Sequence, residues 1–130
     1  MAKRRSPASL ANLPALVPET AVHFRVMEPS LVRLADVCAS QGLRADLAWC
    51  DRAGNVFDAV VDAKGGPVAL LLCPDHTYSD QVAQMPAWVR IRVRKARQAG
   101  LRPVVLSPAT VLKMAHSPRL LLDALQRAPG

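Results

Sequence analysis

Two unbroken apolar stretches mark the second half of the chain. Residues 68–73 hold no polar side chain, and residues 101–107 hold a second, shorter apolar run. A run without alternation is typical of a strand that is covered on both faces. The segment between them has a helical period. Pro86 suits the first turn of such a helix, and Gly100 suits the position just after its last turn. Strand, helix and strand in this order predict a βαβ unit with a right-handed crossover.

The first half predicts one helix and an antiparallel meander. The helix covers residues 28–40, with Pro29 in its first turn. Strands over residues 43–50 and 55–63 follow, and short turns that contain glycine connect them onward to the apolar strand. Alternation in the second of these strands puts four apolar residues on one face, namely Phe57, Ala59, Val61 and Ala63.

Two short helices, over residues 109–116 and 118–127, complete the pattern. The sequence therefore predicts an α/β fold: a small mixed sheet, made of the antiparallel meander plus the βαβ unit, with flanking helices on both faces. A chain of 130 residues is long enough for a single core. We expect one domain over residues 21–130, preceded by an extended basic arm over residues 1–20.

Positive charge is confined to parts of the chain. The formal net charge is +7, yet residues 19–86 carry five basic and nine acidic side chains. Residues 87–107 carry six basic side chains and no acidic one, and the first 18 residues carry three basic and no acidic ones. This asymmetry favours a polyanionic partner over a role in solubility alone.

The predicted helix that begins after Pro86 is the strongest candidate for a binding surface. A solvated helix face normally mixes both signs of charge, because like charges on neighbouring turns repel each other. Here no acid occurs over residues 81–122, which indicates an outside anion, and phosphates are the commonest one. The cations that we expect to contact nucleic acid are Arg90, Arg92, Arg94, Lys95, Arg97 and, on the next strand, Arg102.

Other candidate contacts lie in the loop after the apolar strand and in the arm. The loop offers His76 and Tyr78 at a strand end, where α/β folds place ligands. The arm offers three cations, Lys3, Arg4 and Arg5, and we expect it to become ordered only within a larger assembly. No metal or other cofactor is predicted, because Cys73 and His76 are at most half of a zinc site. No apolar run has the length of a membrane span, and no membrane partner is expected.

The main alternative is an enzyme, a divalent-metal-dependent nuclease of PD-(D/E)xK type that uses Asp58, Asp62 and Lys64. Such a site needs a second acid and a lysine on the following strand. Residues 68–73 supply neither, so we predict no catalytic residues. A third hypothesis is a protein–protein adaptor whose basic helix meets an acidic partner.

Two motifs carry a resemblance to a known family. The pattern Cys73-Pro74-x-His76-x-Tyr78 after an apolar strand, and the helical pattern Arg92-x-Arg94-x-Ala96-x-x-x-Gly100, resemble the RAP domain, an RNA-binding module of organelle RNA-processing proteins. The similarity covers residues 43–126. It departs at Leu70, near which the family commonly has an acid, and at Val111, where the family has a tryptophan.

This resemblance implies a restriction-endonuclease-like fold and RNA binding in mitochondria, or alternatively in chloroplasts. The sequence thus predicts a non-catalytic RNA-binding domain of an organellar ribonucleoprotein, such as a mitochondrial ribosome. Its partners would be ribosomal RNA or an organellar transcript, together with neighbouring proteins.

Overall fold

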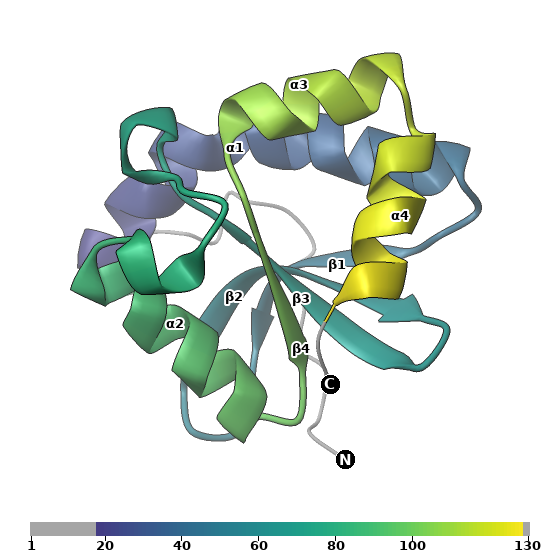
Figure 1. Cartoon of the computed structure of the whole chain (residues 1–130). Helices are drawn as coiled ribbons and strands as arrows, with labels where there is room; N and C mark the ends of the chain where they lie inside the picture. Colours follow the sequence, from purple (N-terminus) through teal and green to yellow (C-terminus); the bar gives the residue numbers. More distant parts are fainter. Residues whose placement is uncertain (1–17, 129–130) are drawn as a thin grey trace.

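The computed structural model of the chain describes residues 18–128, in which four strands form one open mixed sheet (Figure 1). The order across the sheet is β1-β2-β3-β4; β2 is antiparallel to both β1 and β3, and β4 is parallel to β3. The strands are β1 (Ala45–Cys50), β2 (Val56–Ala63), β3 (Gly66–Leu72) and β4 (Arg102–Leu106). The predicted antiparallel meander and βαβ unit are both confirmed.

Helices cover both faces of the sheet, as predicted. One face packs against α2, and the other packs against α1, α3 and α4 (Figure 1). The helices are α1 (Pro18–Ser40), α2 (Ala87–Gln98), α3 (Pro108–His116) and α4 (Arg119–Arg127). Two single turns of 3-10 helix, η2 (Asp75–Thr77) and η3 (Val82–Gln84), lie between β3 and α2.

Helix α1 begins ten residues earlier than predicted, at Pro18, and contains Pro29 in its interior. An interior proline costs roughly 3 kcal/mol, because it removes a backbone hydrogen bond and clashes with the preceding turn. Burial on the N-terminal side of Pro29 offsets this cost. Phe24 and Met27 pack in the same core as Leu31, and burying such a side chain contributes about 1.5–3 kcal/mol.

The start of α1 bears on the prediction of an extended arm over residues 1–20. Residues 18–20 belong to α1, so the prediction of an arm that reaches residue 20 was wrong over its last three positions. The cations Lys3, Arg4 and Arg5 lie outside the described residues.

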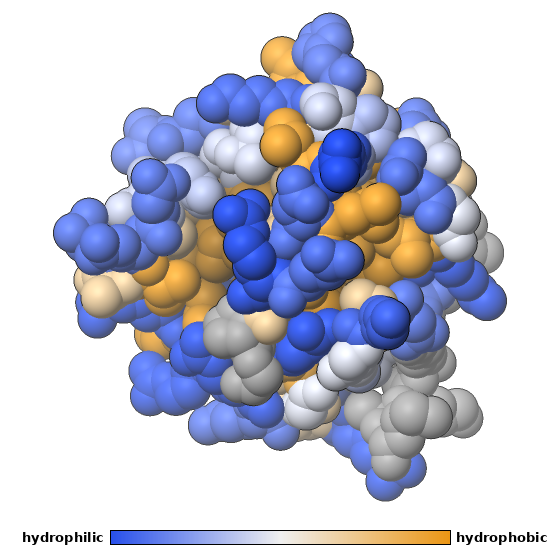
Figure 2. All heavy atoms as spheres, turned by 45° about the vertical axis from the view of Figure 1, so that its right-hand side comes forward, coloured by the Kyte–Doolittle hydropathy of each residue, from blue (hydrophilic) through white to orange (hydrophobic). Residues whose placement is uncertain are grey.

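Strand β3 is buried on both faces, as its unbroken apolar sequence predicted. Val68 and Leu70 pack on the side of α1, while Ala69 and Leu71 pack on the side of α2. Outside this core, hydrophobic side chains appear at the surface in separate patches between hydrophilic ones, as Figure 2 shows for one face.

Alternation in β2 is interrupted at Asp58. Ala59 packs on the side of α1 as expected, but Phe57 packs on the side of α2, next to Trp49 at 5.9 Å between ring centroids. Ala48 lies on β1 across from Asp58, between Leu47, which pairs with Ala59, and Trp49, which pairs with Phe57. The φ angle of Ala48 is 50°. This left-handed residue turns the end of β1, so the prediction that Phe57 and Ala59 share a face was wrong.

The three cysteines provide a test of this packing. All are free thiols, and Cys50 is the only half-buried one while Cys38 and Cys73 are buried. Burial raises the pKa of Cys38 to about 11, and burial likewise raises the pKa of Cys73 despite the opposing effect of Thr77. Because the thiolate is the reactive form, a thiol reagent should label only Cys50 in the native protein and all three cysteines after denaturation.

Mass spectrometry after timed labelling measures this difference. A Cys50→Ser variant should take up almost no label while it is folded. Rapid labelling of Cys38 or Cys73 in that variant would contradict the described core.

Candidate functional site

Strands β2 and β3 separate at one end of the sheet. Their pairing begins with Ala63 opposite Gly66 and stops with Ala59 opposite Leu70. Beyond that point the backbone N–H of Leu72 donates to Oδ2 of Asp58 at 2.8 Å. A side-chain carboxylate thus replaces a backbone carbonyl as the acceptor where the two strands diverge.

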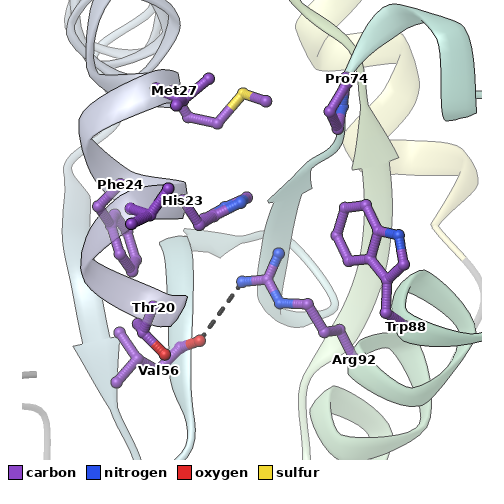
Figure 3. Close-up of a pocket in the computed structure, with 10 residues that line it drawn as sticks. Thr20, His23, Phe24, Met27, Val56, Pro74, Trp88 and Arg92 are labelled. Atoms are coloured by element: carbon purple, nitrogen blue, oxygen red, sulfur yellow. Dashed lines mark hydrogen bonds between the residues drawn. The ribbon is translucent and has the colours of Figure 1, made fainter. Parts of the chain in front are cut away.

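Arg92 of α2 reaches into the gap between the strands. Its Nη1 lies 2.9 Å from Oδ2 of Asp58 and donates to the carbonyl oxygen of Leu72 at 3.5 Å. Its Nη2 donates to the carbonyl oxygen of Val56 at 3.4 Å (Figure 3). A guanidinium group presents several donors in one plane and therefore suits a set of acceptors of this kind. A single side chain joins α2 to both separated strands.

His23 of α1 contacts the other carboxylate oxygen. Its Nε2 lies 2.6 Å from Oδ1 of Asp58, and its ring meets those of Phe24 and Trp88 edge-on, at 5.4 and 6.4 Å between centroids. Asp58 is completely buried and is held from α1, α2 and β3 at once. We call His23, Asp58 and Arg92 the buried cluster.

Asp58 is ionised in the folded protein at neutral pH. Burial by itself acts to raise the pKa of this carboxyl group, because a low-dielectric interior disfavours charge. The positive charge of Arg92 and the hydrogen bonds from His23 and Leu72 outweigh burial and hold the pKa of Asp58 below its ordinary value. The interior of the sheet therefore contains a charged but balanced pair.

A cavity of about 420 Å³ lies between α1 and α2, next to the buried cluster. His23 and Met27 extend toward it from α1, Trp88 and Arg92 extend toward it from α2, and Pro74 lies at its edge just after β3 (Figure 3). Its volume falls within the range of about 300–1,000 Å³ that is usual for ligand sites. The carboxyl end of a parallel strand is a common place for such sites in α/β folds.

The outer face of α2 carries four of the five cations that the sequence placed on this helix. All four are exposed, and α2 contains no acid. Within residues 18–128 none of the four side chains makes an ion pair or a hydrogen bond. We call them the outer cations: Arg90, Arg94, Lys95 and Arg97.

Two predicted RNA contacts are engaged inside the fold through their Nη atoms. Arg92 belongs to the buried cluster. Arg102 donates to the carbonyl oxygens of Lys64, Gly66 and Ala128 at 3.0–3.3 Å, and so ties the turn between β2 and β3 to the end of α4. We therefore leave both arginines out of the candidate interface.

The two loop residues differ in exposure. His76 is exposed on η2, whereas Tyr78 is half-buried against Cys73 and Met85. Burial raises the pKa of Tyr78 above its ordinary value. His76 is thus open to a partner, while Tyr78 presents only part of its ring.

The residues of the nuclease alternative do not converge. Asp58 is enclosed in the buried cluster, and Asp62 lies four residues further along β2, roughly 13 Å away at the rise of a strand. Lys64 lies beyond the end of that strand. Across residues 18–128, no group of three His, Cys, Asp or Glu side chains is placed to hold a metal ion.

The buried cluster escaped the sequence analysis, although part of its signal is present. An acid inside an apolar strand requires a buried partner of opposite charge. Arg92 follows Val89 by three residues and precedes Ala96 by four, which places it beside the core face of α2 rather than among the outer cations. His23 gave no signal, because it lies before the helix that the sequence predicted from residue 28 and nothing local indicates a partner for it.

The coupling within the buried cluster can be measured by a double-mutant cycle. Arg92→Met leaves the Asp58 charge buried without its partner and should lower the free energy of unfolding by roughly 3–5 kcal/mol. Combined with Asp58→Asn, the loss should be smaller than the sum of the two single losses. Urea unfolding gives these values, and Arg94→Met on the exposed face of α2 is the matched control, with little expected change. Additive losses would contradict the cluster.

Acid should weaken the fold through Asp58. Its folded pKa lies below the unfolded value of about 3.9, so its contribution to stability is complete above that value and is lost as pH falls through the folded pKa. The wild-type free energy of unfolding should therefore decrease more steeply below about pH 4 than that of Asp58→Asn. Denaturant titrations over this range measure both slopes, and equal slopes would refute the role of this carboxylate.

Comparisons with protein-family models, with curated proteins and with solved structures found no match to this chain. None of the helices within residues 18–128 combines the length and the apolar character needed to cross a membrane.

Proposed function

We propose that this protein binds RNA through the outer face of α2 and does not cleave it. The observation that carries the proposal is the set of outer cations, which are exposed and lack any partner within residues 18–128. Like charges on adjacent turns of one helix destabilise it. A polyanion relieves this repulsion and releases its own counterions when it binds, which favours association.

The geometry of α2 suits contacts with phosphates. Arg90, Arg94 and Arg97 recur at intervals of four and three residues, so they form one stripe that is roughly 10 Å long. On the neighbouring face of α2, Val89 and Val93 are buried, which fixes the rotation of the helix and keeps the stripe outward. Contacts of this kind position a nucleic acid without reading its sequence.

The resemblance to RAP domains favours RNA as the polyanion, and the rest of the proposal follows from it. It implies a restriction-endonuclease-like fold, which the observed mixed sheet with helices on both faces supports. We propose that the protein acts within an organellar ribonucleoprotein in mitochondria or, alternatively, chloroplasts. Its partners would be ribosomal RNA or an organellar transcript and neighbouring proteins, with His76 and the arm cations as further contacts.

Binding should depend strongly on salt and on the outer cations. Four phosphate contacts predict a plot of log affinity against log salt with a slope of roughly −3 to −4. Reversing three charges, in Arg90→Glu, Arg94→Glu and Arg97→Glu together, should abolish most of the affinity for a structured RNA. Fluorescence anisotropy from low to moderate salt measures both effects.

A matched control changes the net charge equally at other places. Arg33, Arg52 and Arg119 are exposed, lie outside α2, and their side chains have no partner within residues 18–128. Reversing these three should leave most of the affinity intact. A salt-independent affinity, or equal losses in the two triple variants, would overturn the proposed interface.

A further inference from the structure

The rim of the cavity between α1 and α2 is unusually apolar for exposed surface. Three large hydrophobic side chains that line it remain exposed, namely Val22 at 52%, Val26 at 65% and Trp88 at 41%. Single exposed hydrophobic residues need no explanation, but a group around one concave site marks a place where a ligand or partner binds.

The polar groups of the cavity restrict the chemistry of its ligand. Arg92 is already balanced by Asp58, so the cavity offers no uncompensated charge to an anion. Hydrogen-bonding capacity remains at the Thr20 hydroxyl and at Nδ1 of His23, which have no partner within residues 18–128. The site therefore suits a neutral, flat group that has apolar faces and polar edges.

Trp88 supplies a flat surface for such a group. It is the only tryptophan that lines the cavity, its ring lies at the cavity wall, and it is exposed where Trp49 is buried (Figure 3). Aromatic side chains stack on the bases of single-stranded nucleic acids, and the interaction is tolerant of sequence because every base has a π-face.

Two of the outer cations lie further along the same helix from this site. Lys95 follows Trp88 by seven residues, which is two turns further on the same flank of α2, and Arg94 lies beside it on the outer face. A strand with one base in the cavity would therefore have its backbone next to positive charge. This charge favours a nucleic acid over an apolar protein segment as the occupant.

We propose that the cavity receives one unpaired base of single-stranded RNA, stacked on Trp88, while the adjoining phosphates lie along the outer cations. This inference rests on the proposed RNA binding and assigns it a base site and a preference for unpaired RNA. A fully paired duplex would contact the outer cations alone, because its bases are stacked inside the helix.

The test compares a single-stranded ten-nucleotide oligoadenylate RNA with a blunt RNA duplex of the same length. Trp88→Ala should weaken binding of the single strand by roughly 5- to 150-fold, the range expected for the loss of one stacked base. It should leave duplex binding within about twofold, since phosphate contacts do not involve this ring. Trp88→Phe should restore most of the lost affinity, because the phenyl ring still stacks.

Ile91→Ala is the matched control variant. Ile91 is 40% exposed on the next turn of α2 and does not line the cavity, so its removal takes away exposed apolar surface without a stacking ring. Single-strand affinity should stay near the wild-type value. Each adenosine is then replaced in turn by an abasic nucleotide. One of these replacements should weaken binding to the wild type most, and the same replacement should not weaken binding to Trp88→Ala any further.

Each other outcome overturns the inference in a recognisable way. If Trp88→Ala binds the single strand as the wild type does, while charge reversal on α2 abolishes binding, the base site is absent and the proposed function stands. Equal losses for single strand and duplex, or an equal loss in Ile91→Ala, would indicate general apolar docking, as for a protein partner. If the wild type binds neither RNA, the proposed function itself fails.

Discussion

The carboxylate of Asp58 holds together parts of the fold that make few other contacts at this place. It accepts from the Leu72 backbone in β3, from Arg92 in α2 and from His23 in α1, at the point where β2 and β3 separate. A buried ion pair gives little net stability over an apolar alternative, but removal of one partner is severe because the other charge stays buried. Asp58 thus links α1 to α2 directly beside the cavity, in addition to the apolar packing of each helix on the sheet.

Helix α2 divides its five cations between two roles. Arg92 lies beside the buried Val89, Val93 and Ala96 and points inward, whereas the outer cations lie on the remaining circumference. The helical period separates Arg92 from Arg90, Arg94 and Arg97, because residues two and five positions apart fall on different sides of a helix. The inward contact of Arg92 and the buried valines together fix the rotation of α2, which turns Trp88 to the cavity and the outer cations to solvent.

Elements with a consistent local pattern could be predicted from the sequence, and contacts set by tertiary packing could not. The apolar β3 and the helix ended by Gly100, whose φ is 82°, appear as expected. Pro29 misled the prediction of α1, because the gain from burying Phe24 and Met27 is not visible in a local helix-start signal. Arg102 shows the same limit: its three carbonyl acceptors come from segments 26 to 38 residues away along the chain.

The cavity carries no uncompensated charge, whereas the outer cations have no counter-charge within residues 18–128. These two surfaces suit different parts of an RNA strand, the base and the phosphates. Phosphates are attracted by the outer cations irrespective of sequence or pairing, which gives affinity but little discrimination. A charged cavity floor would compete for those same phosphates, whereas the paired Asp58 and Arg92 leave Trp88 and the polar edge of His23 as the attractive groups. A base enters such a site only after it leaves its stack, and this step costs least in a single strand. Discrimination between unpaired and paired RNA would then arise from the cavity, and overall affinity from the outer cations.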